Sequence, residues 1–89
     1  MEVKTIGDNI EITDKDVIVY LVATGFQIKK AYKDPKRNRS IVVFKNSKEL
    51  NEAIINYANK KGKVNVANFI EAEKRVKNLF YLNKNNKVG

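Results

Sequence analysis

Cysteine and histidine are both missing from this 89-residue sequence. Their absence removes disulfides, thiolate nucleophiles, zinc sites of the Cys/His kind and the commonest general base. The two serines, Ser40 and Ser47, fit no G-x-S-x-G motif, and no phosphate-binding glycine loop occurs. We therefore expect a protein that is not an enzyme, with no cofactor, no metal site and no small-molecule substrate.

Long apolar runs are missing as well. No segment approaches the roughly 20 apolar residues that cross a bilayer, and the N-terminus, with Glu2 and Asp8, lacks the pattern of a secretory signal. We expect a cytoplasmic protein with no membrane association. The length suits one domain. The prediction is a single basic α+β domain over residues 1–83 and a flexible polar tail over residues 84–89.

The formal net charge is +8, and it is unevenly distributed. Residues 1–28 hold two basic and five acidic side chains, and residues 46–73 hold four of each. The excess comes from residues 29–45, with seven bases and one acid, and from residues 74–89, with five bases and no acid. Such asymmetry is expected of a protein that binds DNA or RNA. The alternative is a lysine-rich surface that serves only solubility.

Hydrophobic periodicity and capping residues divide the chain into short elements. Residues 2–12 predict a short hairpin or one edge strand. Thr13 is the expected N-cap of a first helix over about 14–24, which Gly25 ends. Further along, the predicted elements are a strand over 26–32, a turn at 34–38, a strand over 40–44, a helix capped by Asn46-Ser47-Lys48-Glu49 and closed by Lys60-Lys61-Gly62, and a third helix from Asn65.

The order β-α-β-β-α-α indicates an α+β fold with a small antiparallel sheet of about three strands and helices on one face. A right-handed crossover would place the N-terminal strand beside the hairpin. The apolar stripe of the third helix is expected to be Val66, Phe69, Ile70, Val76, Leu79 and Phe80.

The hairpin over residues 26–45 is the first candidate binding surface. Alternation along a strand turns Phe26, Ile28 and Tyr32 toward the helices, and Gln27 and Ala31 away from them. The outer face then lacks an aromatic ring, which favours phosphate contacts over base stacking. The candidate nucleic-acid-binding residues are Lys29, Lys33, Lys36, Arg37, Arg39 and Lys45. The alternative is that these charges only protect the sheet edge from aggregation.

A second candidate surface is apolar. Ile41 and Val43 fall on the outward side of the predicted hairpin, where a second copy of the chain or a partner protein could cover them. Phe80 and Tyr81 cannot both face the core, so Tyr81 is a further candidate anchor. These residues indicate a protein-interaction module, either a homodimer or a binder of an acidic protein, as the alternative to nucleic-acid binding.

Several segments together resemble a known kind of domain. They are Thr24-Gly25-Phe26, Val42-Val43-Phe44, Ser47-Lys48-Glu49-Leu50 with Tyr57, the stretch 63–69, and Tyr81. They are similar to a small uncharacterised domain family encoded by bacteria, their phages and other mobile elements, over about residues 10–82. The resemblance implies an accessory protein of a phage or mobile element, acting in the cytoplasm of the cell. Such proteins commonly bind nucleic acid or block a host protein.

Overall fold

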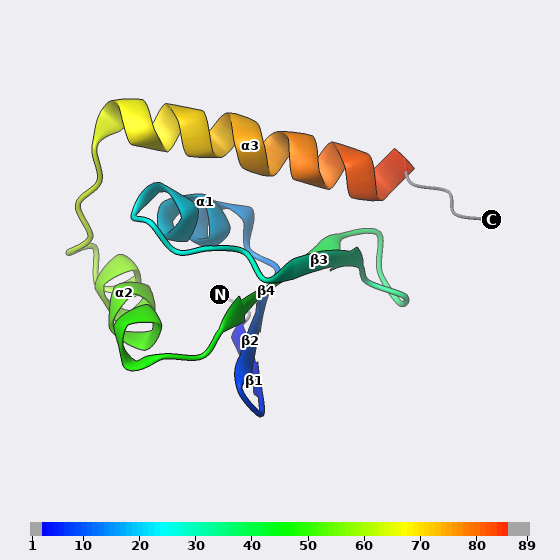
Figure 1. The fold of residues 1–89 in the computed structure, drawn as a ribbon, viewed down its shortest axis with the longest axis horizontal. Helices are drawn as coiled ribbons and strands as arrows, with labels where there is room; N and C mark the ends of the chain where they lie inside the picture. The colour runs from blue at the N-terminus through cyan, green and yellow to red at the C-terminus, as the bar shows by residue number, and fades with distance from the viewer. Residues whose placement is uncertain (1–2, 86–89) are drawn as a thin grey trace.

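The computed structural model describes residues 3–85, which form two antiparallel hairpins and three helices (Figure 1). The α+β class is confirmed, and the N-terminal segment is a hairpin rather than one strand. In chain order the elements are β1 Val3–Ile6, β2 Asn9–Ile12, α1 Lys15–Ala23, β3 Lys30–Lys33, β4 Ser40–Lys45, α2 Lys48–Ala58 and α3 Val66–Asn85.

The sheet has the strand order β1-β2-β4-β3, and every neighbouring pair is antiparallel. As predicted, the N-terminal segment lies beside the second hairpin, because β2 pairs with β4. Gly7, with φ of +57°, occupies the turn between β1 and β2, in a conformation that costs a glycine little. Thus the two hairpins meet along β2 and β4, which form the centre of the sheet.

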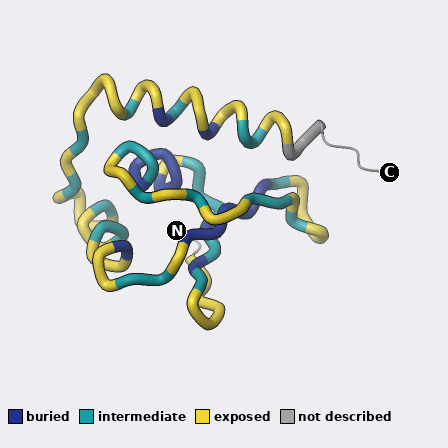
Figure 2. The backbone as a smooth tube through the Cα atoms, in the orientation of Figure 1, coloured by how far each residue is buried: buried dark blue, intermediate teal, exposed yellow. Residues whose placement is uncertain are grey.

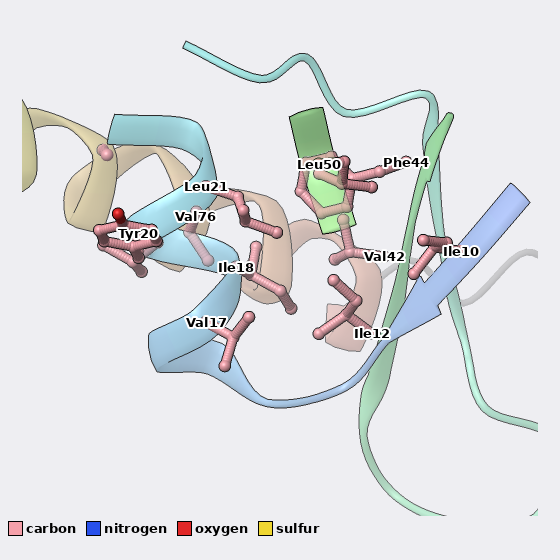
Figure 3. Packing of buried hydrophobic residues seen from close by; sticks show 12 residues of the cluster. Ile10, Ile12, Val17, Ile18, Tyr20, Leu21, Val42, Phe44, Leu50 and Val76 are labelled. Carbon is pink, nitrogen blue, oxygen red and sulfur yellow. The ribbon is translucent and has the colours of Figure 1, made fainter. Parts of the chain in front are cut away.

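The helices cover one face of this sheet and bury the core there (Figure 2). Ile10 and Ile12 from β2 and Val42 and Phe44 from β4 point from the sheet toward the helices. Figure 3 shows them meeting side chains of α1, together with Leu50 of α2 and Val76 of α3. In the described part of the chain, no helix is long and apolar enough to span a membrane.

The first helix begins one residue later than predicted. Its N-cap is Asp14, not Thr13, because the Asp14 carboxylate accepts hydrogen bonds from the amides of Asp16 and Val17 at 3.0 and 3.4 Å. The predicted C-terminal glycine is confirmed, since Gly25 follows the helix with φ of +107°.

The ends of α2 are confirmed in part. Ser47 is the N-cap, and its hydroxyl accepts the amide of Leu50 at 3.0 Å. After the C-cap Asn59, the left-handed residue is Lys60, with φ of +60°, and not Gly62. Gly62 is required for space instead, because a Cβ there would lie 2.5 Å from the Tyr20 hydroxyl.

The third helix starts at the predicted place, and four of the six residues of its predicted apolar stripe pack on the core, namely Phe69, Val76, Leu79 and Phe80. The Asn65 side chain accepts the amide of Asn68 at 3.1 Å. Val66 and Ile70 are 73% and 49% exposed, so their predicted burial is wrong, whereas Ala72 and Val76 are buried. The helix continues to Asn85, past the predicted start of the tail at residue 84. The rest of that predicted tail, residues 86–89, lies outside the described residues.

In the strand predicted over residues 26–32, the alternation between core-facing and outward-facing side chains changes partway along. Phe26 and Ile28 pack on the core, but the strand itself begins only at Lys30. The amide of Lys29 donates to the carbonyl of Val43 at 2.7 Å, although Val43 is paired with Lys30. Two residues therefore stand opposite one, as in a β-bulge. This shift turns Ala31 toward the core and Tyr32 away from it, which reverses the predicted facing of both residues.

Candidate nucleic-acid interface

The outer face of the sheet carries no helix, and the strand register shows which side chains lie on it. Val42 and Phe44 face the core, so Ile41, Val43 and Lys45 of β4 face outward. Their partners on the neighbouring strands share that face. They are Lys4, Ile6, Asn9, Glu11, Lys30 and Tyr32. We call this surface the open face.

The centre of the open face is buried, contrary to expectation. Ile41 is 9% exposed and Val43 only 1% exposed. β4 is an inner strand, so both residues have neighbours on either side rather than at a free edge. The predicted exposure of Ile41 and Val43 is therefore wrong, and the pair offers little apolar surface to a partner.

Two side-chain bridges pass over β4 and account for this burial. The Tyr32 hydroxyl donates a hydrogen bond of 2.6 Å to the Glu11 carboxylate, which lies on β2 on the far side of β4. The Lys29 ammonium donates to Asn9 Oδ1 at 2.7 Å across the same strand. The bond to Glu11, followed by burial, raises the pKa of Tyr32 above its ordinary value of 10.0. Lys30 adds a cation 5.8 Å from the centre of the Tyr32 ring.

Exposed cations surround this closed centre. Lys4, Lys29, Lys30 and Lys45 are all exposed. The register places Lys30 on β3 opposite Val43, Lys45 two residues along β4 and Lys4 on β1 opposite Glu11, and Lys29 directly precedes β3. Glu11 is the acidic side chain that the register places among them, and its carboxylate is already bonded to Tyr32. The open face consequently presents a positive rim around a bonded carboxylate.

The β3–β4 loop is held by Asp34. Its carboxylate accepts the Lys36 amide at 2.9 Å and the Arg39 Nε at 2.9 Å, and the Asp34 amide donates to the Arg39 carbonyl at 2.9 Å. These donors lower the pKa of Asp34 from its ordinary value of 3.8, with the Lys36 amide as the largest cause. The clamp fixes the loop, while the side chains of Lys36 and Arg37 stay exposed at its tip.

A shallow groove of about 520 Å³ joins the loop to the open face. Lys4, Lys36 and Arg39 bring positive charge to it, and Glu11 and Asp34 bring negative charge. Both carboxylates are hydrogen-bonded within the protein, and neither Lys4 nor Lys36 forms an ion pair in the described part of the chain. An anionic oxygen of a ligand fits this arrangement.

Four of the six predicted cations lie at the two ends of the β3–β4 hairpin. Lys29 and Lys45 lie on the open face, and Lys36 and Arg37 lie at the loop tip. Lys33 instead lies on the helix side, beside Phe80, because the bulge reverses its facing. Arg39 is held in the Asp34 clamp, with its side chain 32% exposed.

Sequence reasoning missed Lys4 and Lys30. The alternation of a β1–β2 hairpin would have placed Lys4 opposite Glu11, had the hairpin been chosen over a single strand. Lys30 could not have been found this way, because the bulge that turns it outward has no sequence signal. The same bulge puts an aromatic ring, Tyr32, on a face expected to have none.

Outside this face, Tyr81 is 67% exposed on α3, while the adjacent Phe80 packs against the core. The two residues divide as predicted between surface and core. Within residues 3–85, His, Cys, Asp and Glu side chains form no group of three suited to a metal ion.

A protein-family model described as a domain of unknown function (DUF5659) matches residues 7–82, nearly the whole described chain. Neither the curated proteins nor the solved structures gave a significant match. The matched range includes β2, β3 and β4 but begins after β1, so the match covers most of the open face and not Lys4.

Proposed function

We propose that this chain, which belongs to the DUF5659 family of domains of unknown function, binds nucleic acid through the open face and the β3–β4 loop. The observation that carries the proposal is the set of six exposed cations on this surface, whose two neighbouring carboxylates are both bonded within the protein. The cations are Lys4, Lys29, Lys30, Lys36, Arg37 and Lys45.

Phosphate oxygens are the expected ligands of these cations. Lysine ammonium groups neutralise backbone phosphates and release condensed counterions, which gives affinity with little dependence on base sequence. The Tyr32 ring is partly covered by Lys30 and its hydroxyl is bonded to Glu11. Contacts to the phosphates of the nucleic acid should accordingly dominate over stacking on its bases.

The proposed role is that of a non-enzymatic accessory protein of a phage or mobile element, acting in the cytoplasm. Support for the non-enzymatic part is the lack of cysteine and histidine. The cytoplasmic setting follows from the phage context. The phage context rests on the family resemblance of the sequence.

Fluorescence anisotropy with labelled duplex DNA, single-stranded DNA and RNA, at 50 and 200 mM salt, tests the proposal. Several phosphate contacts would lower the affinity by about 10³–10⁵ over this range. The test variant changes Lys4, Lys36 and Lys45 to Gln, because none of them forms an ion pair within the described residues. The control variant changes Lys61, Lys63 and Lys74, which lie on the helix side, to Gln.

We expect the test variant to lose about tenfold or more in affinity, with the salt slope smaller by about 1 for each phosphate contact removed. The control variant, with the same change in net charge, should bind nearly as wild type. Equal losses in both variants would assign the binding to total charge and overturn the open face as the site. No binding at 50 mM salt would overturn nucleic-acid binding itself.

A further inference from the structure

A second concave surface lies on the opposite side of the molecule, between α1, α2 and the start of α3. This helix groove has a volume of about 550 Å³ and is mainly apolar. The residues that line it are Tyr20, Tyr57, Ala58, Lys60, Gly62, Val64 and Phe69. None of the cations assigned above to nucleic acid lies in it.

The Tyr20 ring in the helix groove has little free face. Tyr20 is 8% exposed, its ring lies 5.4 Å from that of Tyr57 at an angle of 50°, and the backbone of Gly62 closes another side of it. A nucleobase needs an open ring face on which to stack. The groove therefore suits an inserted aliphatic or aromatic side chain better than a base.

Apolar surface continues from the groove onto α3. Val66 and Ile70 lie within one turn of Phe69 and are 73% and 49% exposed. Exposed apolar side chains adjoining an apolar groove are typical of protein docking surfaces. The two residues that the sequence pattern wrongly assigned to the core thus extend the same surface.

The charge around the groove is positive on one side. Residues 53–70 contain three lysines, Lys60, Lys61 and Lys63, and no acidic residue. All three lysines are exposed, and Lys60 lines the groove. On the α1 side, burial and then the charges of Asp16 and Asp14 raise the pKa of Tyr57, so acidic groups lie at the other end. A ligand carrying carboxylates would be held at the lysine end.

We propose that the helix groove docks an acidic amphipathic segment of a partner protein, with its apolar side chains in the groove and its carboxylates against Lys60, Lys61 and Lys63. Helices of this kind use apolar anchors at i, i+3 or i+4 and i+7. This site is independent of the proposed nucleic-acid function and gives the chain two opposite surfaces, one for a polyanion and one for a protein.

Selection of displayed random 16-residue peptides on the immobilised protein tests the proposal. Enriched peptides are synthesised and their affinities measured by isothermal titration calorimetry. The blocking variant is Ala58→Glu, which places a longer side chain in the groove, with the same negative charge as the acidic peptide. The matched control is Asn56→Glu, which adds the same charge in the same turn of α2 at a residue that does not line the groove. Thermal unfolding verifies that both variants fold.

We expect enriched peptides to combine acidic residues with apolar residues at helical spacing. Their affinity should fall at least tenfold in Ala58→Glu and little in Asn56→Glu. A second variant, Lys61→Glu with Lys63→Glu, leaves the groove itself intact and should also lose at least tenfold. A lack of enriched peptides, peptides without acidic residues, or equal binding by both α2 variants would overturn the proposal.

The same variants also distinguish a peptide from a nucleic acid as the ligand of the helix groove. If Ala58→Glu lowers binding of labelled DNA or RNA while Asn56→Glu does not, the groove belongs to nucleic acid and the peptide proposal is wrong. Unchanged nucleic-acid binding in both variants, with lost peptide binding in Ala58→Glu, keeps the two surfaces separate. The lysine variants of the open face should leave peptide binding unchanged.

Discussion

The ring of Tyr20 leaves no room for a side chain at Gly62. The φ angle of Gly62 lies outside the left-handed region, so its backbone would accept any residue. A Cβ there would nevertheless lie 2.5 Å from the Tyr20 oxygen and 2.7 and 2.8 Å from two ring carbons. Tyr20 is packed against Tyr57 and is 8% exposed, which limits how far its ring can move. Space, and not conformation, requires glycine here.

The change Gly62→Ala should lower the free energy of unfolding by about 1–3 kcal/mol, because the added methyl overpacks the Tyr20 site. Urea denaturation followed by circular dichroism measures this loss. In a Tyr20→Phe background the nearest atom is absent, so the cost of Gly62→Ala should be smaller there. An equal cost in both backgrounds would contradict the assigned contact with the hydroxyl.

At the scale of elements, the β3–β4 loop is stabilised by one carboxylate. Asp34 accepts the Lys36 amide and the Arg39 guanidinium, and both favour its charged form in the folded state. Because the folded pKa lies below the unfolded one, this contribution to stability is present above about pH 4 and is lost as the pH falls through the folded pKa. The loop should loosen in acid before the core does.

The change Asp34→Asn should lower the thermal midpoint at pH 7, since the guanidinium loses its anionic partner. The difference between wild type and variant should narrow as the pH falls below about 4 and vanish once Asp34 is protonated. Thermal unfolding at pH values between 7 and 2 measures it. A difference that stays constant across this range would show that the charge of Asp34 does not stabilise the loop.

At the scale of the whole molecule, the net charge of +8 destabilises the folded state through repulsion between like charges. Like charges on the open face and at residues 60–63 repel within a compact chain, and salt screens them over about 10 Å at 0.1 M. The same salt weakens phosphate contacts. Stability and nucleic-acid affinity should therefore respond to salt in opposite directions.

Raising NaCl from about 20 to 200 mM should increase the thermal midpoint of the free protein by a few degrees. The variant with Lys4, Lys36 and Lys45 changed to Gln has three fewer positive charges, so its increase should be smaller. Differential scanning calorimetry of both proteins provides the comparison. If both midpoints are independent of salt, repulsion among these lysines does not limit stability.

The sequence by itself determined the local features of this protein. Ser47 as the cap of α2, Gly25 after α1, Pro35 in the β3–β4 loop and the positions of the three helices all follow from preferences that act within a few residues. The α+β class follows from their order, and four of the six predicted cations are exposed on the open face or at the tip of the β3–β4 loop.

Only the tertiary structure decided which side chains face outward. The bulge at Lys29 and Lys30 depends on pairing with Val43 and reverses every later residue of β3. The Tyr32–Glu11 bridge joins positions 21 residues apart and closes the open face. Ala72 is buried and the more hydrophobic Ile70 is exposed, because the packing of α3 on α1 decides which side of the helix faces the core. Contacts between distant segments set these outcomes, and no short window of sequence contains both partners.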